Sequence, residues 1–287
     1  MKKVNSVFSA PHPHWVGDGF PAKTLFSYGR NGQQISPFLL LDHAGPMQFS
    51  PAERNRGVGE HPHRGFETVT IVYQGELAHK DSTGEHGLIG VGDIQWMTAG
   101  AGILHEEFHS DAFTQAGGTL EMMQLWVNLP TSKKMTAPSY QTITAEQVPT
   151  ISLPEARGKL RVIAGECAGK KGPATTHSPM LVMDGLIKAS GNYQLPIAEG
   201  WSVIIVARTG KISVNSQQLN TGQTIVLSQR GTGVEISAQQ DSELLILAGA
   251  PIEEPLVGYG PFVMNNQTEI NQAISDFQTG KFGQINK

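Results

Sequence analysis

The sequence predicts a mainly β protein made of two tandem β-barrels with a short C-terminal helix. The 33 glycines and 17 prolines punctuate many short runs of valine, isoleucine, threonine and leucine, a pattern typical of sandwiches and barrels rather than of helix bundles. A chain of 287 residues also exceeds the size at which single cores usually divide. Because strand-like runs recur in both halves, we expect two barrels rather than one.

Four segments of the first half are predicted to be strands. Residues 37–41 form a short buried-strand candidate that ends near His43, which we interpret as a histidine satisfied by local hydrogen bonds. Residues 65–73 are rich in β-branched and aromatic side chains, which favours a strand. Residues 87–97 combine a turn with a strand, and residues 121–129 alternate between a core face and a face that can line a pocket.

A polar, loop-like connector separates the two halves. We place an N-terminal domain at residues 1–135, the connector at residues 136–170 and a C-terminal domain at residues 171–287. In the second half, further strand-like runs recur at barrel-like spacing with turn residues between them. These runs are residues 201–206, 211–214, 224–227, 234–236 and 244–247. The second half is therefore predicted to repeat the architecture of the first.

A short helix is predicted near the C-terminus. Asn266 and Glu269 can form a capping box at its start, and Gly280 can end it. Its apolar residues follow helical spacing at Ile270, Ala273, Ile274 and Phe277. We expect this helix to pack on a barrel rather than to carry chemistry.

Composition narrows the classes of partner. A formal net charge of −4 provides no global attraction to nucleic acid or to anionic membranes. The single cysteine, Cys167, excludes an intramolecular disulfide and suits a reducing compartment. No apolar stretch approaches transmembrane length, and the residues after Met1 lack the apolar core of a signal peptide. We expect a cytoplasmic protein with no direct nucleic-acid partner and no membrane partner.

Two short signatures in the first half point to a metal site: His61-Pro62-His63 and His105-Glu106-Glu107. Side chains alternate along a strand, so His61 and His63 share one face, as do His105 and Glu107. Two neighbouring strands can then present three imidazoles and a carboxylate to one point. Such a set suits one divalent transition metal, and an octahedral ion would keep about two positions open for substrate or dioxygen.

A second His-x-His pair, His12 and His14, shows that this pattern also occurs by chance. Prolines interrupt that segment, and proline cannot supply the ladder hydrogen bonds of a regular strand. We expect no metal there.

Longer runs around the histidines resemble the pirin family of the cupin superfamily. They are residues 61–69, 92–100, 102–105, 124–129 and 260–265. The resemblance implies two stacked cupin, or jelly-roll, barrels with metal only in the N-terminal one. The distribution of histidines agrees, because His177 is the only histidine of the second half.

The resemblance also implies the ligand set and the metal. The expected ligands of the metal are His61, His63, His105 and Glu107. In this family the metal is usually iron, as Fe(II). Ligand chemistry alone does not separate iron from Mn, Ni, Cu or Zn. Generic cupins take their carboxylate a few residues after the His-x-His pair, where Glu67 has the parity of His61 and His63. The carboxylate ligand is therefore Glu107, as the pirin pattern favours, or Glu67.

Two functions follow from the resemblance. The first is a quercetin 2,3-dioxygenase-type oxidoreductase that opens a flavonol, or a related enolic or phenolic substrate, with O2. In that reaction Glu107 would be catalytic, accepting the flavonol hydroxyl proton. An apolar wall would come from Phe66, Trp96, Met97, Met122 and Trp126. The alternative is an iron-binding, redox-responsive regulatory protein that acts through a protein partner.

Overall fold

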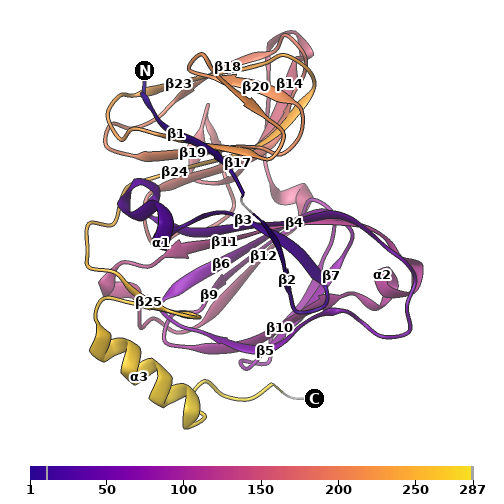
Figure 1. The fold of residues 1–287 in the computed structure, drawn as a ribbon, viewed down its shortest axis with the longest axis vertical. Helices are drawn as coiled ribbons and strands as arrows, with labels where there is room; N and C mark the ends of the chain where they lie inside the picture. Colours follow the sequence, from indigo (N-terminus) through magenta and orange to yellow (C-terminus); the bar gives the residue numbers. More distant parts are fainter. Residues whose placement is uncertain (11, 286–287) are drawn as a thin grey trace. The chain divides into compact units, whose positions relative to one another are not determined.

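A computed structural model describes residues 1–10 and 12–285 as a mainly β protein (Figure 1). The chain forms two compact units, and each combines separate stretches of sequence. The first-half unit consists of His12–Thr24, Leu39–Ala145 and Glu253–Lys287. The second-half unit consists of Met1–Pro11, Leu25–Phe38 and Glu146–Ile252. The predicted domains are continuous stretches divided at residues 135 and 171, and those boundaries stay a prediction.

The first-half unit contains a seven-stranded sheet and a four-stranded sheet. In sheet order, the larger comprises β12 (Ser139–Ile143), β9 (Ile94–Thr98), β6 (Phe66–Gln74), β11 (Gly118–Asn128), β4 (Phe38–Phe49), β3 (Phe20–Ser27) and β2 (Pro13–Val16). The smaller comprises β5 (Gly57–His63), β10 (Ile103–His109), β7 (Leu77–Asp81) and β8 (His86–Ile89). Strand β10 pairs antiparallel with β5 on one side and β7 on the other.

The second-half unit has the same combination of sheets. Its seven-stranded sheet comprises β1 (Val4–Ser9), β22 (Gln223–Leu227), β19 (Ser202–Ala207), β24 (Ser242–Gly249), β17 (Met180–Ile187), β14 (Gly158–Ala164) and β13 (Thr150–Ser152). Its four-stranded sheet comprises β18 (Asn192–Pro196), β23 (Gly233–Ala238), β20 (Lys211–Val214) and β21 (Gln217–Asn220). The predicted repetition of one architecture in both halves is confirmed.

Short elements complete the chain. The remaining strands are β15 (Glu166–Cys167), β16 (Lys170–Lys171), β25 (Val257–Tyr259) and β26 (Phe262–Met264). The helices are α1 (Tyr28–Asn31), α2 (Asp111–Ala116), α3 (Gln267–Gln278) and the 3-10 turns η1 (Gly32–Ile35), η2 (Thr131–Lys133), η3 (Ala145–Gln147) and η4 (Pro154–Ala156). Among the described residues, no helix is both long enough and apolar enough to span a bilayer.

Strand β4 runs further than the sequence suggested. The predicted strand stops near His43, whereas β4 continues through the Gly45-Pro46 peptide to Phe49. His43 has a partner, but the expectation of a local one was wrong, because its Nε2 lies 2.9 Å from the carboxylate of Glu121 on the distant strand β11. The Gly-Pro pair therefore lies within a strand and does not mark its end.

The C-terminal helix α3 forms where it was predicted. The Asn266 side chain accepts a hydrogen bond from the Glu269 N–H at 3.0 Å, and the Glu269 carboxylate accepts one from the Asn265 N–H at 2.9 Å. These reciprocal bonds satisfy N–H groups that a helix start would otherwise expose. Ile270 and Ala273 are fully buried in a cluster with Leu104 of β10, so the helix packs on the first-half unit.

Candidate metal centre

Strands β5 and β10 bring three histidines together. His61 and His105 are directly opposite each other in the ladder, and His63 is opposite Ile103. The ring centroids of His61 and His105 lie 4.2 Å apart, and those of His63 and His105 lie 4.8 Å apart. One ligand nitrogen from each of the three falls within 4.8 Å of the others. The convergence follows from strand alternation, because cross-strand neighbours project from one face.

The histidine nitrogens suit a metal ion. Within the described part of the chain, neither nitrogen of the buried His105 has a hydrogen-bond partner, and Nδ1 of the buried His63 also lacks one. Nδ1 of His61 donates to the Gly59 carbonyl, 2.8 Å away, so that Nε2 is available. Burial, and then the neighbouring imidazoles, lower the pKa of His63 and His105 well below the usual histidine range. The rings are therefore neutral, which is the form that binds a divalent transition metal.

Glu107 lies beside this cluster on the same face of β10. The Thr70 hydroxyl lies 3.2 Å from Oε1 and 2.6 Å from the Gln124 amide oxygen, so that its one hydrogen is shared between these acceptors, and the Gln124 NH2 group donates to Oε2 at 3.5 Å. Burial raises the pKa of Glu107 to about 7, and the Thr70 hydrogen bond opposes that rise. Thr70 was not singled out from the sequence, whereas Gln124 is on the face of residues 121–129 that was expected to line a pocket. The regular alternation of β6 and β11, whose residues 70 and 124 pair directly, is the signal that identifies them.

Glu67 points the other way. The Thr98 hydroxyl donates to its carboxylate at 2.7 Å, and burial raises its pKa to about 7. Glu67 and Thr70 are three residues apart on β6, so they project from opposite faces of the strand. The parity that linked Glu67 to His63 was wrong, because a bend at Gly65, with φ of +87°, separates β5 from β6 and interrupts the alternation. Phe66 takes the histidine side instead, 5.1 Å from the His63 ring.

A cavity of about 310 Å³ opens beside the three histidines. It is lined by polar residues, among them His61, His63, Glu107 and Gln124, and by apolar ones, among them Phe20, Met122 and Trp126. Two residues of the predicted apolar wall, Met122 and Trp126, therefore line it. Phe66 stacks on Trp126 with ring centroids 4.4 Å apart. The placement of Trp96 in the wall was wrong, because it pairs with Val69 on the Glu67 side of the sheet.

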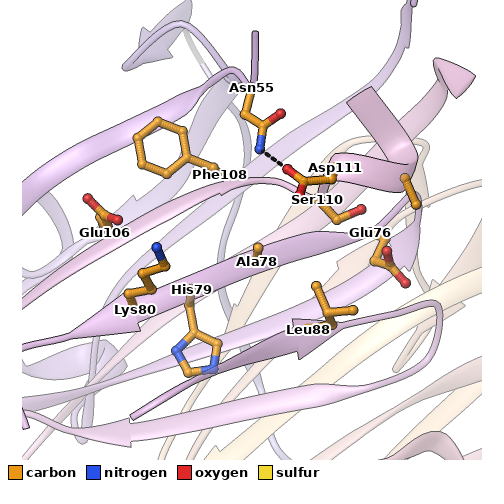
Figure 2. Close-up of a pocket in the computed structure, with 11 residues that line it drawn as sticks. Asn55, Glu76, Ala78, His79, Lys80, Leu88, Glu106, Phe108, Ser110 and Asp111 are labelled. Atoms are coloured by element: carbon orange, nitrogen blue, oxygen red, sulfur yellow. Dashed lines mark hydrogen bonds between the residues drawn. The ribbon is translucent and has the colours of Figure 1, made fainter. Parts of the chain in front are cut away.

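The outer face of the four-stranded sheet carries a second, larger hollow of about 550 Å³, shown in Figure 2. Lys80 and Glu106, which face each other across β7 and β10, line it together with Phe108. Glu106 alternates with His105 and Glu107 along β10, so it lies away from the histidine cluster. The middle residue of the His105-Glu106-Glu107 signature is therefore not part of the candidate site.

The second His-x-His pair lies apart from the cluster. His14 is on β2, which pairs with β3 at the edge of its sheet, and is 3.8 Å from the Asp42 carboxylate. The expectation that prolines prevent a regular strand there was wrong, since an edge strand tolerates a residue that lacks an N–H.

Comparisons with known proteins give a consistent family. A family model described as Pirin matches residues 19–127, and one described as Pirin C-terminal cupin domain matches residues 182–283. A Pseudomonas aeruginosa protein, whose name gives it a provisional quercetin 2,3-dioxygenase activity, is 53% identical over 98% of this chain and 99% of its own. Human Pirin is 37% identical over 98% of this chain and 94% of its own.

A solved structure matches the fold closely. The crystal structure of a quercetin 2,3-dioxygenase from Acinetobacter baumannii superposes with a TM-score of 0.96 at 53% sequence identity. The match covers 99% of both chains. Both predicted barrels are therefore cupin domains.

Proposed function

The chain belongs to the pirin family, and from that premise we propose that it is a metal-dependent dioxygenase that opens a flavonol, or a related enolic or phenolic compound, with O2. One observation carries the proposal. Three neutral imidazoles converge beside one cavity, and two of them have buried nitrogens that find no partner among the described residues. A buried polar atom without a partner costs free energy, so its retention favours a role in binding.

His61, His63, His105 and Glu107 are the residues that would hold the metal, and Fe(II) is our first choice ahead of Mn, Ni, Cu and Zn. When bound, such an ion supplies Lewis-acid and redox chemistry toward the substrate oxygen and dioxygen. The fit rests on the donor set, because three imidazoles and a carboxylate suit every metal of this group.

The cavity walls provide substrate recognition. Met122, Trp126 and Phe20 offer apolar and aromatic surface to the flat rings of a flavonol, and they exclude water from the reacting atoms. The cavity volume, about 310 Å³, is within the range of small-molecule sites. Polar groups at Gln124 and Asp42 can orient the substrate hydroxyls.

Glu107 would accept the proton of the substrate hydroxyl. Its carboxylate reaches the cavity, and the hydrogen bonds from Thr70 and Gln124 hold both of its oxygens in place. A base held in one orientation removes the proton without first paying to order its side chain. We further propose the cytoplasm as the location, since the free thiol of Cys167 suits a reducing compartment.

Oxygen consumption tests the proposal. We would add quercetin to anaerobically purified, iron-loaded protein and then follow oxygen uptake and flavonol loss, with His61→Ala as the control. We expect uptake in the wild type and none in the variant. A protein with a filled site that consumes no oxygen would contradict the dioxygenase function and would favour the regulatory alternative, in which the iron state alters binding to a protein partner.

A further inference from the structure

Strand β7 places two further polar side chains on the inner face of the four-stranded sheet. Asp81 is directly opposite His105 in the ladder, and His79 is directly opposite Glu107. Both are buried, with 2% and 5% of their surface exposed. Figure 2 shows His79 and Lys80 leaving β7 on opposite sides, as strand alternation requires. Asp81 is therefore the cross-strand neighbour of His105, whereas His79 also lines the hollow of Figure 2.

The second-half unit shows what this place in the sheet contains when no site is present. Strand β20 occupies the position of β7 in the matching order of four strands. Its inward residues are Ile212 and Val214, and both are fully buried in an apolar core. Aliphatic side chains thus complete a sheet of this kind without buried polar atoms. The polar pair on β7 is costly by comparison, and such a departure marks a functional position.

The hydrogen-bond acceptors around the three histidine rings indicate a role for Asp81. A histidine that binds metal through one nitrogen donates its other N–H to an acceptor, which fixes the orientation of the ring. The Gly59 carbonyl serves His61 at 2.8 Å, and the Pro261 carbonyl is close enough to His63 to oppose the lowering of its pKa. His105 has no acceptor at either nitrogen among the residues that the structure describes.

Asp81 has the complementary vacancy. Its Oδ1 accepts hydrogen bonds from the Thr83 N–H, from the Thr83 hydroxyl at 2.7 Å and from the Glu85 N–H at 3.2 Å. Its Oδ2 is buried and has no hydrogen-bond partner in residues 1–10 and 12–285. A carboxylate with one anchored oxygen and one open oxygen, opposite an imidazole that lacks an acceptor, is arranged to take its N–H.

We propose that Asp81 is a positioning residue of the metal site, whose Oδ2 accepts the N–H of His105 that faces away from the metal. The inference rests on the proposed metal site. Tyr140 packs beside His79. Its ring stacks on the imidazole with centroids 5.2 Å apart, and its hydroxyl donates to the Met97 sulfur at 2.8 Å. Gly87 opposite His79 keeps room for the ring, because a Cβ there would lie 3.1 Å from Nε2.

Asp81→Asn tests the proposal with little disturbance of the fold. The amide oxygen can keep the hydrogen bonds of Oδ1, while the NH2 group puts a donor where an acceptor is needed. Apparent affinities for Fe²⁺ and for Co²⁺ alone would be measured by competition with a chelator, and the absorption bands of bound Co²⁺ would be recorded. We expect binding to weaken by about 10- to 100-fold and the Co²⁺ bands to shift.

Asp93→Asn is the matched control, because it makes the same change at an aspartate in the turn before β9, whose oxygens accept the Gly90 and Ala145 N–H groups. We expect its metal affinity to stay within about threefold of the wild type, well short of the effect of an outer ligand partner. Unchanged affinity and spectrum in Asp81→Asn would overturn the proposal, as would an equal loss in Asp93→Asn. Metal affinity does not depend on turnover, so a failed oxygen assay would leave this result separately interpretable.

Discussion

The two units share one arrangement of sheets and differ in what their inner faces carry. In each, a seven-stranded sheet accompanies a four-stranded one with a central strand, β10 or β23. The inward residues of β10 include His105 and Glu107, whereas β23 presents the buried aliphatics Val234 and Ile236. The same arrangement of strands can therefore enclose polar side chains or an apolar core. A few inward positions on neighbouring strands decide whether a barrel is a site or only a core.

The largest expected effect comes from giving the first-half unit the interior of the second. His105→Val should weaken binding of Fe²⁺ by more than about 100-fold, beyond the loss expected for an outer partner. It should also stabilise the metal-free protein by about 1 to 3 kcal/mol, because it removes two buried nitrogens that lack partners. Chelator competition measures the first effect, and urea unfolding of the metal-free protein measures the second.

The reverse exchange is the control. Ile236→His puts an imidazole into the fully buried apolar core of the second-half unit. We expect a loss of about 2 to 4 kcal/mol in unfolding free energy and no gain in bound metal. If Ile236→His left stability unchanged, the contrast between the two interiors would lose its energetic basis.

The two buried glutamates provide the next comparison. Glu107 faces the histidine cavity and Glu67 faces Thr98 on the other side of β6. Glu107→Gln should reduce oxygen uptake with quercetin by about 100-fold or more, because it removes the proton acceptor. Glu67→Gln should leave the iron affinity within about twofold, far less than a lost partner of a ligand costs. If Glu67→Gln lowered oxygen uptake and iron affinity as much as Glu107→Gln does, the assignment of Glu107 as the carboxylate ligand would be contradicted.

A smaller effect is expected at the C-terminal helix, which belongs only to the first-half unit. Asp276 accepts hydrogen bonds from Lys281 at 2.7 Å and from Gln272 and Arg64 at 2.8 Å. These bonds, with that of Lys281 the largest, hold the pKa of Asp276 well below its usual range. Asp276→Asn should lower the unfolding free energy by about 2 kcal/mol at pH 7.

The pH dependence of that loss has a defined sign. A lowered pKa in the folded state stabilises the protein above the ordinary aspartate pKa, near about 4. The stabilisation disappears as pH falls through the lower folded value. Urea unfolding should therefore show a smaller difference between wild type and Asp276→Asn at pH 3 than at pH 7. A constant difference would contradict the ionic role, and exposed Glu253→Gln should change little at either pH.

The smallest effect on metal binding and stability is expected on the outer face of the four-stranded sheet that contains β7 and β10. Lys80 and Glu106 line the larger hollow but project away from the histidines. Glu106→Gln should leave metal affinity unchanged and alter stability by no more than about 0.5 kcal/mol, as is usual for surface positions. Comparison with Glu107→Gln, the adjacent residue, would show that strand parity separates the two glutamates. A loss of metal in Glu106→Gln would contradict the placement of Glu106 away from the metal site.

Much of the fold was predictable, because glycine and proline mark turns locally and strand alternation is visible in the sequence. The cap of α3 at Asn266 and Glu269 is a local signal of the same kind. The exchange of segments between the units was not predictable. Strand β1 pairs with β22, more than 200 residues away along the chain, and no local pattern specifies such a partner.

The histidines could be found from the sequence because both pairs of neighbours lie within single strands. Parity failed at Glu67, where the turn at Gly65 interrupts the alternation. His79 and Asp81 carry the same i, i+2 signal as the histidine pair, yet they stand out only once β7 is known to pair with β10. Site residues were thus predictable within a strand and not across a turn or between strands.

The iron content of the protein decides whether the first-half unit binds a metal through its histidines. After anaerobic loading with Fe²⁺ and removal of excess ion, wild type and His105→Val would be analysed for iron per chain. The contrast between the two units predicts one ion per chain in the wild type and none in the variant. A wild type that retains no metal, or a variant that retains as much as the wild type, would contradict it.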